Sequence, residues 1–191
     1  MFSSDLAGGV VTHMKELDAS RRALQALSAE ILSASKRGIF AFHRGDGKTA
    51  KTELAAARKK LDDGRAIIER ESRLAQEGMW RAAQEEYSEA DLFSQYLSKQ
   101  KIGRVSGVSD DPDLFIGGLS DLTGELTRRA VLLASERKRE DVERIFEDVS
   151  AVVDFFLRMD LTGGLRTKVD QAKQNLRKIE EIRYDLAIRA S

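Results

Sequence analysis

Two carboxylates interrupt an otherwise apolar helical face in the segment 79–93. On a helix with 100° per residue, Glu86 is surrounded within about 60° by apolar residues: Met79, Ala82, Ala83, Ala90, Phe93 and Leu97. Glu89 lies at the edge of this arc, and the polar side of the helix is formed by Arg81, Gln84, Ser88 and Gln95. A buried charge without compensation costs several kcal/mol, so both carboxylates need a cation, a metal ion or a proton.

A second pair of acids has helical spacing further along the chain. Asp121 and Glu125 are one turn apart, which places their carboxylates on one face, and Gly117 and Gly124 lie near it. No Lys or Arg occurs from residue 106 to 127, so no base close in sequence neutralises the pair. If the two helices are neighbours, Glu86, Glu89, Asp121 and Glu125 converge. Four carboxylates without histidine form an oxygen-only site, which suits Mg²⁺ or Mn²⁺ better than zinc.

The alternative for these acids is ordinary ion pairing. Arginines on other helices, such as Arg22, Arg128 or Arg129, are available as partners in a chain with 34% charged residues. For a single Glu this interpretation is the more common one, whereas the position of Glu86 in the apolar arc favours a metal or a catalytic role. A ferritin-like di-metal site needs two Glu-x-x-His pairs. The only histidines are His13 and His43, and neither follows a Glu at that spacing.

The elements that must position these acids are helical. The 191 residues include one Pro and no Cys, and apolar residues recur at helical spacing with no sustained alternation of period two. We expect an all-α, up-and-down bundle of about six or seven helices in a single domain over residues 1–191, with long first and last helices. The expected helices span approximately residues 6–43, 48–75, 76–101, 112–133, 139–159 and 165–189. Gly64 marks a kink or a close packing point.

The most basic part of the chain lies between Lys36 and Arg65. It holds nine Lys and Arg against four Asp and Glu, although the formal net charge of the chain is zero. Such a segment either contacts nucleic-acid phosphates or is a solvated helical face. The candidate phosphate-binding residues are Lys36, Arg37, Arg44, Lys48, Lys51, Arg58, Lys59 and Lys60. No apolar run is long enough to cross a membrane and no signal peptide is recognised, so we expect a soluble, cytoplasmic protein.

Three motifs resemble the translin and Trax (translin-associated factor X) family. Gly118-Leu-Ser-Asp-Leu-Thr-Gly-Glu-Leu-Thr-Arg128 is similar to the Gly-x-x-Asp-Leu-Thr-Gly-Glu-Leu-x-Arg signature of Trax. Glu86-Tyr-Ser-Glu-Ala90 is similar to Glu-Tyr-x-Glu-Ala of Trax. The segments Arg166-Thr-Lys-Val-Asp170, Lys178-Ile-Glu-Glu and Tyr184-Asp-Leu-Ala-Ile-Arg189 resemble the last helix of both subunit types.

The resemblance implies a seven-helix α-fold that assembles into octamer-like shells with a basic interior for single-stranded RNA or DNA. It also implies that Glu86, Glu89, Asp121 and Glu125 are the catalytic carboxylates of a Trax-type, Mg²⁺-dependent endoribonuclease. Translin lacks the Asp of the Asp-Leu-Thr-Gly-Glu motif, so Asp121 favours the Trax type. The chain lacks the terminal extensions of eukaryotic Trax, so we expect a homo-oligomer, with a translin-like partner subunit as the alternative.

Three functional hypotheses remain from the sequence. The first is Mg²⁺-dependent cleavage of short single-stranded RNA, with Mn²⁺ as a possible substitute and Glu89 or Glu125 as the general base. The second is a non-catalytic oligomer that binds single-stranded RNA or DNA. The third is a helical scaffold in which the acids only form ion pairs.

Overall fold

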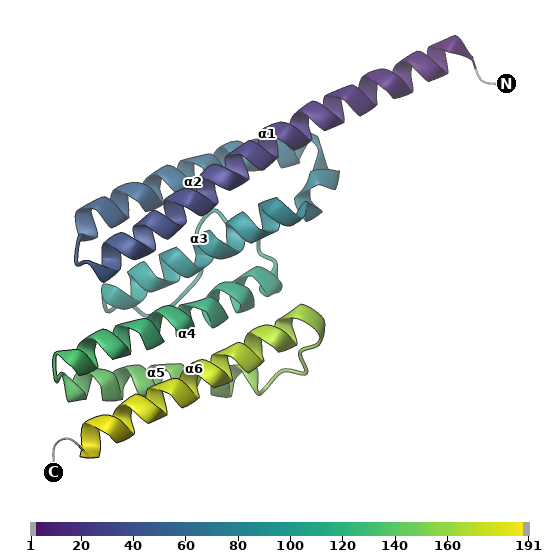
Figure 1. Ribbon diagram of the computed structural model, residues 1–191. Coiled ribbons are helices and arrows are strands. Elements are labelled where there is room, and N and C mark those ends of the chain that lie inside the picture. Colours follow the sequence, from purple (N-terminus) through teal and green to yellow (C-terminus); the bar gives the residue numbers. More distant parts are fainter. Residues whose placement is uncertain (1–2, 189–191) are drawn as a thin grey trace. The chain divides into compact units, whose positions relative to one another are not determined.

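The computed structural model describes residues 3–188. All regular secondary structure in these residues is helical (Figure 1). Within these residues there are six α-helices, one short 3-10 helix and no strand, which confirms the all-α prediction and the long first and last helices. Residue 189, the expected end of the last helix, lies outside the described residues. The helices are α1 (Ser4–His43), α2 (Gly47–Arg70), η1 (Ser72–Gln76), α3 (Gly78–Leu97), α4 (Pro112–Ser135), α5 (Arg139–Phe156) and α6 (Gly163–Ile188).

The chain divides into two compact units. The first comprises residues 1–87 with 106–109, and the second comprises residues 88–105 with 110–191. The division falls inside α3, between Tyr87 and Ser88, so this helix contributes its first half to one unit and its second half to the other.

In the first unit, α1 and α2 pack along each other as a helical hairpin. The sequence Arg44-Gly-Asp-Gly47 makes the turn between them, as its glycines predict, because Gly45 adopts a left-handed conformation with φ 76°. Asp46 then caps α2 by accepting a hydrogen bond from the backbone N–H of Thr49 at 3.0 Å. This cap satisfies one of the free N–H groups at the start of the helix.

The core of the first unit is formed by leucine and isoleucine on facing sides of the hairpin. Leu24 and Ile31 of α1 and Leu61 of α2 are at most 1% exposed. The ring of Trp80, on α3, lies directly against Gly64 of α2, where any larger side chain would collide with it. Of the two roles that the sequence suggested for Gly64, close packing is therefore the one observed.

In the second unit, α4, α5 and α6 pack against one another in pairs. Pro112 occupies the first turn of α4, and the Asp111 carboxylate caps this helix by accepting the backbone N–H of Asp113 at 3.0 Å. The buried core contains Leu122 and Leu126 of α4, Ile145 of α5 and Ile179 of α6, each at most 2% exposed.

Helix α3 differs from the amphipathic helix that the sequence predicted. Gln84 and Ser88, which were assigned to its polar side, are 2% and 1% exposed, whereas Met79 of the apolar arc is 43% exposed. The reason is that α3 has packing partners in both units, so small polar residues on it are buried as well. The Gln84 side-chain oxygen accepts the backbone N–H of Ser109 at 3.0 Å, which compensates its burial.

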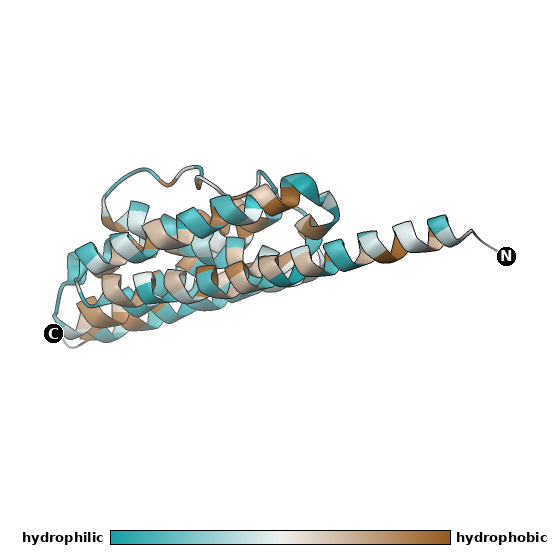
Figure 2. Cartoon of the chain, turned by 90° about the horizontal axis from the view of Figure 1, so that it is seen from above, coloured by the Kyte–Doolittle hydropathy of each residue, from teal (hydrophilic) through white to brown (hydrophobic). Residues whose placement is uncertain are grey.

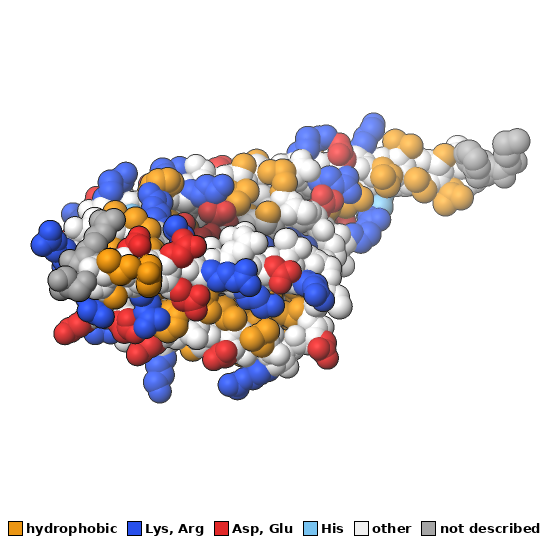
Figure 3. Space-filling model, turned by 60° about the horizontal axis from the view of Figure 1, so that its bottom comes forward, with side chains coloured by type: hydrophobic (Ala, Val, Ile, Leu, Met, Phe, Trp, Pro, Cys, Tyr) orange, Lys and Arg blue, Asp and Glu red, His pale blue; other side chains and the backbone are white. Residues whose placement is uncertain are grey.

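The first turns of α1 carry apolar side chains that remain exposed. Figure 2 shows hydrophobic residues interspersed with hydrophilic ones along this end of the helix. Leu6, Val10, Val11 and Met14 are each more than half exposed. Figure 3 shows hydrophobic side chains gathered on this stretch beside the N-terminus. Among the described residues, no helix is both long and apolar enough to cross a membrane.

Candidate metal centre and basic surface

Helices α3 and α4 touch within the second unit at Gly118. A Cβ atom on Gly118 would lie 2.7 Å from the Cβ of Ser88 and 3.1 Å from the backbone nitrogen of Glu89, so only glycine permits this approach. Asp121 and Glu125 follow Gly118 by one and two helical turns on the same face of α4. Three of the four predicted carboxylates thus lie on two helix segments in direct contact.

These three carboxylates are largely withdrawn from water. Glu89 is 9% exposed, and the side chains of Asp121 and Glu125 are 29% and 21% exposed. Charges with so little hydration need compensation by nearby positive charge or hydrogen-bond donors.

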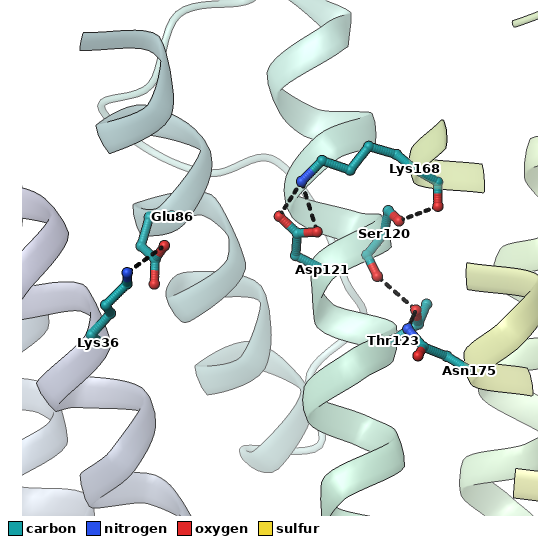
Figure 4. Close-up of polar contacts among 7 residues, drawn as sticks. All are labelled: Lys36, Glu86, Ser120, Asp121, Thr123, Lys168 and Asn175. Atoms are coloured by element: carbon teal, nitrogen blue, oxygen red, sulfur yellow. Dashed lines mark hydrogen bonds and ion pairs between the residues drawn. The ribbon is translucent and has the colours of Figure 1, made fainter. Parts of the chain in front are cut away.

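Lys168 of α6 supplies this compensation for Asp121. Its Nζ lies 2.8 Å from Oδ1 and 2.6 Å from Oδ2 of Asp121, so the ammonium group donates to both carboxylate oxygens (Figure 4). The inference from the sequence considered only bases close in sequence to this pair, whereas Lys168 is 47 residues away and reaches Asp121 through the packing of α6 on α4.

Polar contacts between α4 and α6 fix the position of Lys168. The Ser120 hydroxyl donates to the backbone oxygen of Lys168 at 2.7 Å, and the Asn175 amide donates to the Thr123 hydroxyl oxygen at 2.8 Å (Figure 4). Thr123 in turn donates to the backbone oxygen of Ser120 at 2.6 Å. Lys168 and Asn175 were not identified as site residues from the sequence, although Lys168 belongs to the Arg166-Thr-Lys-Val-Asp170 segment of the family resemblance.

The other two charged contacts are longer. Glu125 Oε2 lies 3.9 Å from the guanidinium of Arg128, one turn along α4, and Arg128 was among the arginines considered as ion-pair partners. In the first unit, Glu86 Oε2 lies 3.9 Å from Lys36 Nζ of α1 (Figure 4). The Glu86 side chain is only 19% exposed, while that of Lys36 is 61% exposed. A predicted catalytic residue and a predicted phosphate-binding residue are thus neighbours.

The carboxylates suit Mg²⁺ by donor type, because this ion prefers oxygen ligands. Their positions, however, do not form a complete metal site. Within the described residues of either unit, no three Asp, Glu or His side chains form a group that could hold a metal ion. Asp121 accepts from Lys168 with both oxygens, so a metal ion at Asp121 would share the carboxylate with this ammonium group or displace it.

The eight predicted phosphate-binding residues form two groups of four, one with ion-pair partners and one without any among the described residues. Lys36, Arg37, Arg58 and Lys60 form ion pairs with the acids Glu86, Glu53, Asp62 and Glu30 respectively. For Arg37 and Glu53 the distance is 2.8 Å, and for Arg58 and Asp62 it is 3.3 Å. These contacts reduce the positive charge that the composition of the segment suggested.

The remaining four residues, Arg44, Lys48, Lys51 and Lys59, are exposed and form no salt bridge with any residue in the described part of the chain. Lys48, Lys51 and Lys59 fall within about 80° of one another around α2, on the side opposite its buried residues. They form a short cationic stripe, which is hereafter called the α2 stripe.

Comparisons with known proteins relate this geometry to a family. The family model described as "Translin family" matches residues 19–190. The comparison with curated proteins gave no match.

Solved structures with a similar fold include AfC3PO, with a TM-score of 0.85 and 24% identity over 95% of this chain and 97% of that chain. AfC3PO in a duplex RNA complex has a TM-score of 0.83 and 21% identity over 95% and 96% of the two chains. Apo-NeC3PO has a TM-score of 0.88 and 17% identity over 97% and 99%.

Proposed function

The chain belongs to the translin family, and we propose from this premise that it is a Trax-type, Mg²⁺-dependent endoribonuclease of short single-stranded RNA. The observation that carries the proposal is the contact of Glu89 with Gly118. This contact places Glu89 beside the α4 face that bears Asp121 and Glu125, the acids of the Asp-Leu-Thr-Gly-Glu motif. A nuclease of this kind needs oxygen ligands on converging helices. Glu89, Asp121 and Glu125 are the proposed ligands, although their side chains, as they lie in the described residues, do not form a group that could hold a metal ion.

In this proposal the acids have two roles, metal binding and proton transfer. Glu89, Asp121 and Glu125 of the second unit would hold the ion, and Glu89 or Glu125 would take the proton from the attacking water. The catalytic role of Glu86 is proposed separately, because Glu86 belongs to the first unit. The bound Mg²⁺ supplies Lewis-acid stabilisation of the charge that develops on the phosphodiester oxygens. Lys168, which donates to Asp121, is a cation that would neutralise charge on a phosphate bound beside this carboxylate.

RNA binding is supported by two facts. AfC3PO has been crystallised with duplex RNA, and this chain exposes the α2 stripe and Arg44 without competing salt bridges in its described residues. We propose that these four cations contact backbone phosphates, with little base preference. Single-stranded RNA is the proposed substrate, and single-stranded DNA is a further proposed ligand. In the cleavage and binding assays, a duplex RNA of the same sequence serves as the comparison.

The proposed active form is a homo-oligomer, of octamer size if it follows the family, working in the cytoplasm. Leu6, Val10, Val11 and Met14 at the start of α1 support an oligomer, because this much exposed apolar surface on one helix is typical of an interface. A translin-like partner subunit is the alternative occupant of that surface.

A second candidate function is RNA binding without cleavage. The observation that favours it is the Lys168–Asp121 ion pair, which neutralises the motif acid without any metal ion. In this case Asp121 and its neighbours serve the packing of α4 on α6 and take no part in chemistry.

Cleavage and binding assays on the same RNA distinguish the two. A labelled single-stranded RNA is incubated with the purified protein in Mg²⁺, in Mn²⁺ and in EDTA, and binding is measured over a range of salt concentrations. The nuclease gives products only with a divalent ion. Salt-sensitive binding without products in any ion supports the non-catalytic function instead, and the absence of both binding and cleavage contradicts both.

A further inference from the structure

A pocket of about 730 Å³ lies in the second unit. It is lined by the C-terminal end of α3, by residues 99–102 that follow this helix, and by residues of α4 and α5. Its volume falls within the roughly 300–1,000 Å³ that is typical of small-molecule sites. None of the predicted carboxylates or basic residues lines it.

The inner walls of this pocket are aliphatic. Leu126 and Leu133 contribute from α4, where they are two turns apart, and Ile145 and Val152 contribute in the same way from α5. Leu97 closes the wall at the end of α3. A bound molecule therefore needs an apolar body to displace water from these surfaces favourably.

The acids that line the pocket are already engaged. Asp148 accepts a hydrogen bond from the Tyr96 hydroxyl at 2.8 Å, and Asp141 lies 3.5 Å from the Arg144 guanidinium. Burial, together with the contact to Asp148, raises the pKa of Tyr96, so its phenol stays protonated and keeps donating to Asp148. Asp141 is therefore ion-paired, whereas Asp148 keeps its negative charge, because its donor is the neutral phenol of Tyr96.

Three of the cations that line the pocket have no such partner. Lys99, Lys101 and Arg129 form no salt bridge with any described residue, whereas Lys138 is paired with Glu136 at 2.7 Å. These three cations outnumber Asp148, the one lining acid without an ion pair among the described residues, so the net charge of the pocket lining is positive.

Lys99 is held there at a conformational cost. It adopts a left-handed φ of 56° where it ends α3, and the Lys99 and Gln100 N–H groups bond to Tyr96 and Gln95 carbonyls at 3.0 and 3.1 Å. Glycine is the favoured residue at such a position, because it lacks the Cβ that strains this conformation. Arg137 ends α4 with the same conformation, φ 60°, but its side chain does not line the pocket.

We propose that this pocket binds a small amphipathic anion, with its carboxylate or phosphate head group on Lys99, Lys101 and Arg129 and an aliphatic chain against the leucine and isoleucine wall. Charge complementarity selects the head group, and the apolar wall selects the chain. The proposal does not depend on the nuclease function.

Isothermal titration with four probes tests both halves of this recognition. Decanoate and decyl phosphate carry head group and chain, decanol carries the chain alone, and inorganic phosphate carries the head group alone. We expect the first two to bind at least about tenfold more tightly than either partial probe, because each half contributes independently. Equal binding of decanol and decanoate, equal binding of phosphate and decyl phosphate, or no binding of any probe would overturn the proposal.

The two left-handed positions offer a matched pair of variants. Lys99→Gly removes a cation from the pocket and relieves the strained conformation, so we expect decanoate affinity to fall about tenfold while the melting temperature holds or rises. Arg137→Gly relieves the same conformation outside the pocket and leaves affinity unchanged. Equal affinity of the Lys99→Gly variant and the wild type would overturn the assignment of Lys99.

Vesicles containing an anionic phospholipid distinguish the source of the ligand. Retention on these vesicles that Lys99→Gly abolishes identifies a lipid in a bilayer as the source. Decanoate binding without retention identifies a free amphipathic anion.

Discussion

At the scale of single residues, the ion pair between Asp121 and Lys168 determines how the carboxylate site behaves without metal. Both Asp121 oxygens accept from one ammonium group, and the two side chains are about one third exposed. We expect a divalent ion at Asp121 to compete with the Lys168 ammonium for the carboxylate oxygens. Metal binding and the ion pair are thus linked in free energy.

Replacing Lys168 with methionine tests this competition. Loss of the ammonium removes the donor that contacts both oxygens of the partly buried Asp121 carboxylate, so we expect the free energy of unfolding in EDTA to fall by about 1–3 kcal/mol. Excess Mg²⁺ should restore part of this loss in the Lys168→Met variant, and stabilise it more than it stabilises the wild type, because the ion takes the place of the lysine. Urea denaturation with and without Mg²⁺ measures both effects.

Lys173→Met is the control, since Lys173 makes only a local contact of 3.5 Å with Asp170 on the exposed side of the same helix. Its stability should change by no more than about 0.5 kcal/mol, with or without Mg²⁺. If Mg²⁺ stabilises Lys168→Met no more than it stabilises the wild type, competition between the lysine and the ion is excluded.

Sequence spacing could predict the acids of the candidate site but not their partners. Asp121 and Glu125 share a face because helical periodicity requires it, and the family resemblance of Glu86-Tyr-Ser-Glu-Ala90 adds Glu86 and Glu89 to the same set. Lys168 reaches Asp121 only through the packing of α6 on α4, which no local periodicity encodes. The helical wheel of α3 also assigned the buried residues Gln84 and Ser88 to the polar side, because it assumes a helix with a single buried face.

At the scale of the helices, the approach of α3 to α4 at Gly118 is what brings Glu89 to the motif acids. Gly124, on the same helix, is less closely packed. A Cβ at this position would have the Asn175 side-chain nitrogen as its nearest atom, at 3.6 Å. These two glycines therefore have different roles, although the sequence motif contains both.

Alanine at each position separates the two roles. Gly118→Ala forces the Ser88 side chain and the Glu89 backbone away, so we expect a loss of about 1–3 kcal/mol in stability and reduced RNA cleavage. Gly124→Ala meets only ordinary contacts and should gain up to about 1 kcal/mol from helix propensity. Thermal unfolding of both variants measures the difference, and a Gly118→Ala protein as stable as Gly124→Ala would contradict the close approach.

The helices themselves were predictable because their signals are local. The glycines of 44–47, Pro112 with Asp113, and the heptad spacing of Leu17, Leu24 and Ile31 each depend on neighbours within a few turns. The sequence placed one continuous helix at 48–75, whereas the structure ends α2 at Arg70 and continues as η1. No breaking residue stands at that point, so the pattern of residues 70–72 contained no signal for it.

At the scale of the whole molecule, the exposed apolar start of α1 is the surface through which we expect chains to associate. Replacing Val10 and Met14 by glutamate places charge on this surface without touching the buried core, since both residues are more than half exposed. Light scattering coupled to size-exclusion chromatography should then show a smaller assembly than the wild type forms.

Lys15→Glu changes the charge of the same segment at an exposed polar position and serves as the control. It should leave the mass of the assembly unchanged. An unchanged mass for the Val10→Glu, Met14→Glu protein would exclude this surface as the site of association.

The central claim is that the carboxylates of α3 and α4 support metal-dependent cleavage of RNA. Its most direct test is the single-turnover cleavage rate of a labelled single-stranded RNA in Mg²⁺, for the wild type, Asp121→Asn and Glu86→Gln. Glu147→Gln is the control, because Glu147 is an exposed acid of α5. We predict that Asp121→Asn and Glu86→Gln lower the rate by about a hundredfold or more while RNA binding persists, and that Glu147→Gln does not. Wild-type rates for the Asp121→Asn and Glu86→Gln variants, or undiminished cleavage in EDTA, would contradict the account.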